Sequence, residues 1–206
     1  MKKIAMLGGT FNPIHNGHIQ MALGFVKALK LDSLLLMPAN IPPHKRFVDA
    51  VSAGDRLAMC RLAAAGYPAL EACDLELRRQ GPSYTADTLE QLKELFPGDE
   101  LYLIMGADMF LTVQDWKRAE TIVHSAVLCA APRDDDSYNK LTEHAQALTR
   151  RFGDSVRCRI VDLPLVDISS TQIRARVAQG LPLTGLVPPS VEEYMKSKGL
   201  YQKKSG

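Results

Sequence analysis

Short apolar runs alternate along the chain with segments in which apolar residues recur at helical spacing. This alternation is typical of parallel β-strands joined by crossover helices. The apolar runs, which predict strands, cover 4–7, 34–37, 70–77, 101–105, 126–130 and 159–163. The periodic segments, which predict helices, cover 17–30, 52–66, 84–96 and 141–152, and two short helices are expected after residue 168. The pattern predicts an α/β fold, a doubly wound parallel sheet with a small helical C-terminal portion.

Capping signals mark several of the expected helix ends. Asn16 is expected to cap the first helix, and Ser190 is expected to open the last one through a capping box. Gly199 is expected to end that last helix. No internal repeat and no linker rich in Gly, Ser or Pro divides the sequence. We therefore expect residues 1–206 to form a single domain, in which 168–206 make up the helical C-terminal portion.

Charge is balanced along the 206-residue chain. Its 25 basic and 23 acidic residues are interspersed, and the formal net charge is +2. Such a distribution has no basic stripe for a long nucleic acid, so we expect no nucleic-acid partner. A local site for an anion is compatible with it.

The N-terminal apolar run is too short for a signal-peptide core, and no apolar stretch reaches transmembrane length. We therefore expect a soluble, cytoplasmic protein that does not bind a membrane. Four widely spaced cysteines, Cys60, Cys73, Cys129 and Cys158, show no C-x-x-C pair. They predict buried, reduced thiols, with a zinc site or a disulfide framework as the alternative.

Glycines and histidines follow the first predicted strand, where residues 8–18 read GGTFNPIHNGH and run into a helix. Small residues let the backbone approach a nucleotide, and the helix N-terminus offers N–H groups to phosphate. The G-x-G-x-x-G and Walker fingerprints are absent, which disfavours hydride transfer and P-loop hydrolysis. His15 and His18 could both donate to one phosphate. A lone histidine would suit a capping or core role, but two around a glycine favour phosphate chemistry.

A second anion-directed segment covers residues 167–176, which read DISSTQIRAR and open a predicted helix. The hydroxyls of Ser169, Ser170 and Thr171 precede the first helical turn. Arg174 follows Thr171 by three residues, so its guanidinium and the helix N-terminus could face one anion. An N-cap serine with a surface arginine is the alternative. Two such helix starts in one small domain favour a polyphosphate ligand.

These segments carry a family resemblance. Residues 9–18 resemble the GTFxPxHxGH signature of the HxGH nucleotidyltransferase superfamily, and 168–174 resemble its ISSTxxR signature. With the PPHK segment at 42–45 and the strand end at 106–108, the order and spacing resemble bacterial nicotinate mononucleotide adenylyltransferases across essentially the whole chain. Asn12 is one departure, since related members often carry Asp there. The resemblance implies a Rossmann-like nucleotidyltransferase fold.

The resemblance also implies a reaction in NAD biosynthesis. The 5′-phosphate of nicotinate mononucleotide would attack the α-phosphorus of ATP in line, giving nicotinate adenine dinucleotide and pyrophosphate without a covalent enzyme intermediate. The residues agree, because no serine or cysteine nucleophile with an attendant base is visible, and such transfer can run on positioning and charge stabilisation. Mg²⁺ is implied as the metal, carried mainly by the ATP oxygens. No acidic cluster in the sequence indicates metal ligands of the protein.

The roles implied by the resemblance divide between two substrates. His15, His18 and Arg174 would be catalytic, with His18 the more central, and Arg174 with the 169–171 helix start would hold the β- and γ-phosphates. The residues implied in ATP binding are Gly8, Gly9, Thr10, Phe11, Lys45, Gly106, Asp108, Ser169, Ser170 and Thr171. Asp108 would accept from a ribose hydroxyl, although an aspartate after a strand could instead cap a helix. Lys45 could equally be a solvated loop lysine.

On the pyridine side, Thr85 and the first N–H groups of the predicted helix could receive a carboxylate. Tyr84 or Trp116 could stack on the ring, and a core or lid role is the alternative for Trp116.

Two other functions stay open. Phosphopantetheine adenylyltransferases share the first signature but usually carry Thr at the position of His15, and a non-catalytic nucleotide-binding regulator would need only the pocket.

Overall fold

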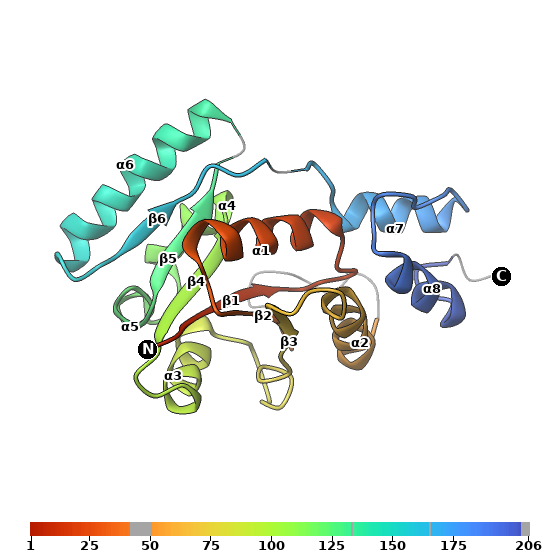
Figure 1. Ribbon diagram of the computed structural model, residues 1–206, viewed down its shortest axis with the longest axis horizontal. Helices are drawn as coiled ribbons and strands as arrows, with labels where there is room; N and C mark the ends of the chain where they lie inside the picture. Colours follow the sequence, from red (N-terminus) through yellow and green to blue (C-terminus); the bar gives the residue numbers. More distant parts are fainter. Residues whose placement is uncertain (42–50, 133, 165, 203–206) are drawn as a thin grey trace.

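The computed structural model describes residues 1–41, 51–132, 134–164 and 166–202, and its centre is a sheet of six strands (Figure 1). The strands are β1 (Lys3–Gly9), β2 (Ser33–Pro38), β3 (Leu70–Ala72), β4 (Glu100–Gly106), β5 (Val127–Ala131) and β6 (Cys158–Ile160). Their order is β3-β2-β1-β4-β5-β6, and every neighbouring pair is parallel. The order reverses between β1 and β4, which confirms the doubly wound sheet. In sheets of this kind ligands generally bind at the carboxyl ends of the strands next to the reversal.

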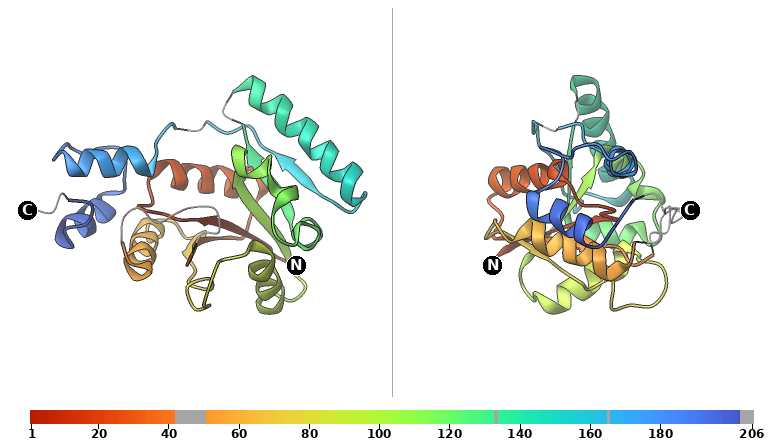
Figure 2. Two further views of the ribbon diagram at one scale, coloured as in Figure 1. Left: turned by 180° about the vertical axis from the view of Figure 1, so that it is seen from behind. Right: turned by 90° about the vertical axis from the view of Figure 1, so that its right-hand side faces the viewer.

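The helices follow the strands as crossovers and then form the C-terminal portion. They are α1 (Asn16–Leu29), α2 (Ala53–Ala64), α3 (Thr85–Leu95), α4 (Ala107–Phe110), α5 (Ala119–Ser125), α6 (Asp135–Phe152), α7 (Ser170–Ala178) and α8 (Pro189–Ser197), with a 3-10 helix η1 at Val113–Asp115. Figures 1 and 2 show α7 and α8 together at one end of the molecule and α6 at the other. β1 runs toward the end where α7 and α8 lie (Figure 1).

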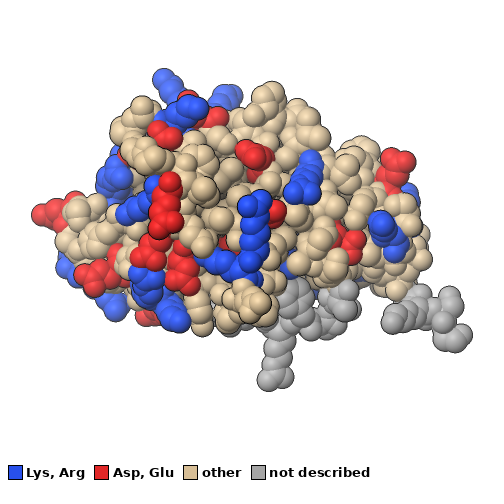
Figure 3. Space-filling view, turned by 90° about the horizontal axis from the view of Figure 1, so that it is seen from below, with Lys and Arg blue, Asp and Glu red and all other residues tan. Residues whose placement is uncertain are grey.

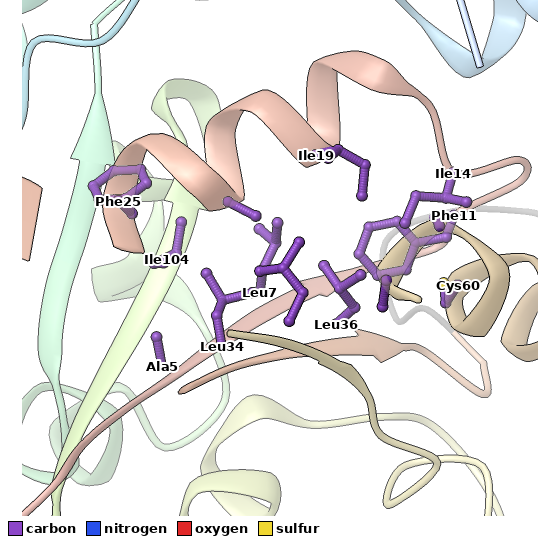
Figure 4. Close-up of a cluster of buried hydrophobic side chains, with 14 of the residues drawn as sticks. Ala5, Leu7, Phe11, Ile14, Ile19, Phe25, Leu34, Leu36, Cys60 and Ile104 are labelled. Carbon is purple, nitrogen blue, oxygen red and sulfur yellow. The ribbon is translucent and has the colours of Figure 1, made fainter. Parts of the chain in front are cut away.

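Alternation along the central strand divides the interior into two cores, because successive side chains of a strand point to opposite faces. In β1, Ala5 and Leu7 belong to a core shared with α1, α2, α7 and α8, and Figure 4 shows part of it. Ile4 and Met6 belong to the core shared with α3, α4, α5 and α6. Each face of the sheet is therefore covered by helices, and the near-continuous apolar strands are explained by burial on both sides.

Several predicted boundaries differ from the structure. β3 ends at Ala72 instead of residue 77, because residues 74–77 form a turn. β6 covers Cys158–Ile160 instead of 159–163, and α6 begins at Asp135, where Asp134 and Ser137 form a capping box ahead of the expected start at 141. The helical segments between 107 and 125 were not expected, since each is too short to show a period.

Two capping predictions were wrong. His15, not Asn16, is the N-cap of α1, and the amide of Asn16 donates instead to the carbonyl of Gly185 at 2.9 Å. The last helix begins at Pro189 after the N-cap Pro188. The side chain of Pro188 makes no capping hydrogen bond, so the expected capping box is not formed. Ser190 lies inside that helix, and its hydroxyl donates to the Leu62 carbonyl at 3.4 Å.

The surface seen in Figure 3 carries basic and acidic side chains side by side. Within the described ranges, no helix is long and apolar enough to cross a membrane. The four cysteines are free thiols; Cys60 and Cys129 are buried, and Cys73 and Cys158 are half-buried.

Candidate active site

Three segments of the chain lie along the carboxyl edge of the sheet. Gly9 at the end of β1 is in register with Pro38 at the end of β2, and Leu7 is in register with Ile104 of β4. Just beyond β2, Ile41 forms a bridge with Pro82, which precedes α3. The loop after β1, the start of α3 and the end of β4 therefore lie along one edge, as the position of the sequence motifs predicts.

His15 and His18 cap α1 reciprocally. Nδ1 of His15 accepts from the backbone N–H of His18 at 3.4 Å, and Nδ1 of His18 accepts from the N–H of His15 at 3.3 Å. The two rings stack with their centroids 3.6 Å apart. A neutral imidazole whose Nδ1 accepts carries its proton on Nε2. The cap therefore selects the tautomer in which both rings present Nε2–H as a donor.

Burial determines the charge of His15. The residue is 5% exposed, and loss of hydration lowers its pKa to about 4. His15 is therefore a neutral donor at pH 7, not an imidazolium. A Cβ at Gly17 would lie 3.2 Å from Nδ1 of His15, so the glycine of the motif leaves room for the ring.

The second motif lies against the first. Ser169 caps α7 by accepting from the N–H of Gln172 at 3.1 Å. The Ser170 hydroxyl donates to the Pro13 carbonyl at 2.9 Å, and Nη1 of Arg174 donates to the Asn12 carbonyl at 2.9 Å. These contacts bring the helix start predicted to bind an anion next to the histidine loop, although the segments are far apart in the sequence.

Nη2 of Arg174 is 3.3 Å from the Thr171 hydroxyl oxygen, to which it donates. One edge of the guanidinium is thus held by the loop and by its own helix. This argues against the alternative of a surface arginine without a tertiary role.

Phe11 shapes the loop after β1. It is 2% exposed and adopts a left-handed backbone with φ 48°, and its ring meets the ring of His18 edge-on at 5.0 Å. A Cβ at Gly9 would approach this ring to 3.0 Å, so Gly9 allows the ring to fold back under the strand end. Gly8 has more room, since a Cβ there would meet only Cε of Met6 at 3.6 Å.

Gly106 and Asp108 lie at the end of β4. Gly106 is exposed and is the N-cap of α4, and Asp108 is exposed in the first turn of that helix. Gly106 occupies the N-cap position, so Asp108 is not the N-cap residue of α4. Lys45, with the rest of 42–50, lies outside the described residues.

The residues predicted for the pyridine side gather around the start of α3. Tyr84 is the N-cap of α3 and makes no side-chain capping bond, which leaves the first-turn N–H groups without that partner. The ammonium of Lys117 lies 4.0 Å from the centroid of the Tyr84 ring. Its neighbour Arg118 pairs with Asp87 of α3 at 3.0 Å. These contacts bring the segment that carries Trp116 onto α3.

Trp116 itself is half-buried, packs against the second core and donates from Nε1 to the Thr112 hydroxyl at 3.3 Å. Trp116 therefore contributes partly to the core shared with α3, α4, α5 and α6 and stays partly exposed.

A buried polar network supports the start of α3. Thr88 is fully buried; its hydroxyl donates to Glu76 at 2.8 Å and accepts from Arg79 at 2.5 Å. Glu76 is 5% exposed, and burial raises its pKa, although hydrogen bonds from Thr88 and Ser83 oppose this. The network ties the turn after β3 to the first turn of α3.

Sequence reasoning missed Arg56 and Tyr201. Arg56 is 1% exposed, and its Nη1 donates to the Thr10 carbonyl at 2.9 Å. A signal existed for Arg56, since it stands three and four positions before Met59 and Cys60 and so falls on the apolar stripe of α2. The hydroxyl of Tyr201 donates to Oδ1 of Asn12 at 2.6 Å, and nothing in the local sequence indicates this contact.

The donor set of the site suits an anion better than a metal ion. In the part of the chain that the structure describes, no group of three or more His, Cys, Asp or Glu side chains could hold a metal.

Comparison with known proteins agrees with this geometry. Residues 6–176 match the Cytidylyltransferase-like family, a range that includes both motifs. A protein of Shewanella pealeana named "Probable nicotinate-nucleotide adenylyltransferase" is 41% identical over 97% of this chain and 96% of its own length. A protein of the same name from Desulfatibacillum aliphaticivorans is 39% identical over 97% of this chain and 99% of its own.

Solved structures share the fold. The nicotinic acid mononucleotide adenylyltransferase of Plasmodium falciparum, solved in complex with NaAD, superposes with a TM-score of 0.77 over 98% of both chains at 18% identity. The same enzyme complexed with APC gives a TM-score of 0.75. The fold, the two motifs and the full-length similarity together show that the chain belongs to the nicotinate-nucleotide adenylyltransferase family of cytidylyltransferase-like nucleotidyltransferases.

Proposed function

We propose that the chain transfers the adenylyl group of ATP to nicotinate mononucleotide, giving nicotinate adenine dinucleotide and pyrophosphate in NAD biosynthesis. The observation that carries the proposal is the convergence of His15, His18 and Arg174 around the loop after β1. The capping box makes both imidazoles Nε2–H donors, and the guanidinium lies against the same loop. Membership of the family supplies the identity of the two substrates.

The reaction needs positioning and charge stabilisation. An oxygen of the mononucleotide 5′-phosphate forms a bond to the α-phosphorus, and the bond from that phosphorus to the bridging oxygen breaks, so that pyrophosphate leaves with the electron pair. His18, with His15 beside it, donates to the α-phosphoryl oxygens as charge develops there. Arg174 and the α7 start at Ser169, Ser170 and Thr171 hold the β- and γ-phosphates.

The adenosine half binds along the strand ends. Gly8, Gly9, Thr10 and Phe11 pass close to the nucleoside, where Gly9 and the buried Phe11 ring give the backbone its tight course. Gly106 and Asp108 at the end of β4 lie beside the crevice, and we assign the exposed Asp108 carboxylate to a ribose hydroxyl. Lys45 stays a proposed phosphate ligand.

The nicotinate half binds at the start of α3. Thr85 and the first N–H groups of α3 receive the carboxylate, because the helix lacks a side-chain cap. Lys117 over the Tyr84 ring adds positive charge nearby, and Trp116 or Tyr84 stacks on the pyridine. Mg²⁺ is the divalent ion we assign to the ATP oxygens, in keeping with the donor set of the site. We further propose that residues 1–206 form one domain that acts in the cytoplasm on these soluble substrates.

One assay tests the function. The protein is incubated with ATP and Mg²⁺, together with nicotinate mononucleotide, phosphopantetheine or no acceptor, and pyrophosphate and the coupled product are measured. Pyrophosphate and nicotinate adenine dinucleotide should form together only with nicotinate mononucleotide. Product with phosphopantetheine instead, or nucleotide binding without pyrophosphate release, would replace the proposal with one of the other two functions.

A further inference from the structure

The loop between β1 and α1 turns four acceptor oxygens toward side chains from distant segments. Two of the side chains that donate to these oxygens come from α7. Ser170 donates to the Pro13 carbonyl and Arg174 to the Asn12 carbonyl, both at 2.9 Å. Arg56 of α2 donates to the Thr10 carbonyl at 2.9 Å. The fourth donor is the phenol of Tyr201, which is 2.6 Å from Oδ1 of Asn12 and is the shortest of the set.

The backbone before Tyr201 is arranged to make this contact. α8 ends at Ser197, and Gly199 just after its C-cap has φ 61°. The N–H of Leu200 donates to the Met195 carbonyl at 2.9 Å, which turns the chain back toward the sheet. Tyr201 then adopts φ 62°, a left-handed backbone that is uncommon for an aromatic residue. Such a conformation persists only where surrounding contacts determine it, and the partly buried hydrogen bond to Asn12 is one of them.

Asn12 connects Tyr201 to the phosphate site. The residue is 8% exposed, its side chain is held by Tyr201, and its carbonyl holds Nη1 of Arg174. The hydrogen bond from Tyr201 anchors the side chain and thereby the backbone of Asn12. Without that anchor the backbone could shift and move the carbonyl that orients the guanidinium. A small displacement of a group that grips phosphate costs rate, because transfer depends on alignment.

We propose that Tyr201 is a positioning residue for adenylyl transfer, which fixes Asn12 and through it the orientation of Arg174 toward the ATP phosphates. The inference rests on the proposed function and extends the site to the C-terminal segment after α8. Tyr201 touches no reacting atom in this assignment. Its effect should appear in the handling of ATP and not in the handling of the pyridine nucleotide.

Tyr201→Phe tests the inference, because it keeps the ring and removes only the donor. We expect kcat to fall about tenfold, the KM for ATP to rise, and the KM for nicotinate mononucleotide to stay within about twofold. The matched control is Tyr194→Phe, which removes the phenol that donates to Asp55 at 2.8 Å on the neighbouring helix pair. This control should change thermal stability to a similar extent and leave both KM values and kcat near wild type.

A double-mutant cycle with Asn12→Ala shows whether Tyr201 acts through Asn12. In the Asn12→Ala background, Tyr201→Phe should cause no further loss of kcat, since the contact is already gone. Additive losses, or a Tyr201→Phe enzyme with wild-type kinetics for ATP, would overturn the inference. A wild-type protein that makes no dinucleotide would instead overturn the proposed function, so the two failures are distinguishable.

Discussion

His15 and His18 carry out two tasks with the two nitrogens of each ring. Each Nδ1 caps the helix start, and each Nε2–H is thereby committed to donation. An ionised aspartate at the cap would satisfy the same backbone groups but would present no donor to an anion. Histidine at both positions therefore suits the phosphate site that we propose.

His18→Ala should lower kcat about a hundredfold or more while changing the KM for ATP much less. The donor is expected to strengthen its bond as charge develops on the α-phosphoryl group, and loss of one such donor costs roughly 3 kcal/mol of transition-state stabilisation. Steady-state kinetics of the folded variant measure this. His124→Ala removes an exposed histidine far from the motifs in sequence and serves as the control. Turnover of His18→Ala close to that of the control would exclude the role.

His15 should make stability depend on pH in a window that ordinary histidines do not cover. Burial lowers its folded-state pKa from 6.5 to about 4, so between these values the unfolded chain binds a proton that the folded chain does not. The contribution of neutral His15 to the free energy of unfolding is complete above about pH 6.5. It is lost as the pH falls toward 4, by about 3 kcal/mol at most.

Chemical unfolding at several pH values measures this loss in the wild type and in His15→Asn, since asparagine is a good N-cap that does not titrate there. The free energy of unfolding of the variant should fall less between pH 6.5 and 4. Parallel curves for the two proteins would contradict the prediction.

At the scale of elements, α3 is supported at its start and along its exposed face. Its start has no side-chain cap but rests on the buried network of Glu76, Arg79 and Thr88. Arg118 holds its exposed face through Asp87 and Glu90. This arrangement keeps the first-turn N–H groups in place without occupying them with a cap, which is what a carboxylate site requires.

Thr88→Val should destabilise the protein by about 2–3 kcal/mol, because the shape is kept while a buried carboxylate and a guanidinium each lose a partner. Thermal or denaturant unfolding measures the loss. Thr142→Val on α6 is the matched control, since that hydroxyl bonds to the Tyr138 carbonyl of its own exposed turn. We also expect a raised KM for nicotinate mononucleotide in Thr88→Val. Equal stability of the two variants would show that the network carries no weight.

The start of α3 should also discriminate between nicotinate and nicotinamide mononucleotide. The acid accepts from the N–H groups and from Thr85, whereas the amide directs its own NH₂ donors toward some of them and leaves groups unpaired. Each mismatch costs about 1–3 kcal/mol, so kcat/KM should favour the acid by roughly tenfold to more than a hundredfold.

Measurement of kcat/KM for both mononucleotides at saturating ATP, in wild type and Thr85→Val, separates the contributions. A preference that survives Thr85→Val would place selectivity in the backbone donors. Equal efficiency for acid and amide in the wild type would rule out a carboxylate site at this helix.

For the molecule as a whole, two cores enclose the sheet, and the thiols of Cys60 and Cys129 are buried in them. Burial raises the pKa of Cys60 and of Cys129 to about 12 and that of Cys158 to about 11. Because the thiolate is the reactive form, a pKa of about 12 in place of 9.0 leaves about a thousandfold less of it at neutral pH.

A thiol reagent should therefore label Cys60 and Cys129 only after unfolding. Mass spectrometry of the native and the guanidinium-treated protein would locate the label. The half-buried Cys73 and Cys158 provide an internal comparison and should react first. Fast labelling of Cys129 in the native protein would contradict the burial of β5 inside the sheet.

The sequence by itself determined the succession of strands and helices and the two motifs, one after β1 and one at the start of α7. Both depend on local information: apolar runs identify buried strands, helical spacing identifies amphipathic helices, and glycines with histidines form a recognisable family signature. It was less accurate where a segment is short, as for β3, β6 and the helices between 107 and 125. Short segments show too little of a period, and tertiary packing decides their ends.

Only the tertiary structure decided which distant residues meet. The contact of Arg174 with Asn12 spans 162 positions, and that of Tyr201 with Asn12 spans 189. The burial of Arg56 and the network around Thr88 likewise depend on how helices lie on a parallel sheet. No local pattern contains this information, because hydrogen bonds between segments are set by strand order and by side-chain packing. The helix start at 169–171 is recognisable in the sequence, but the fold brings it to the histidines.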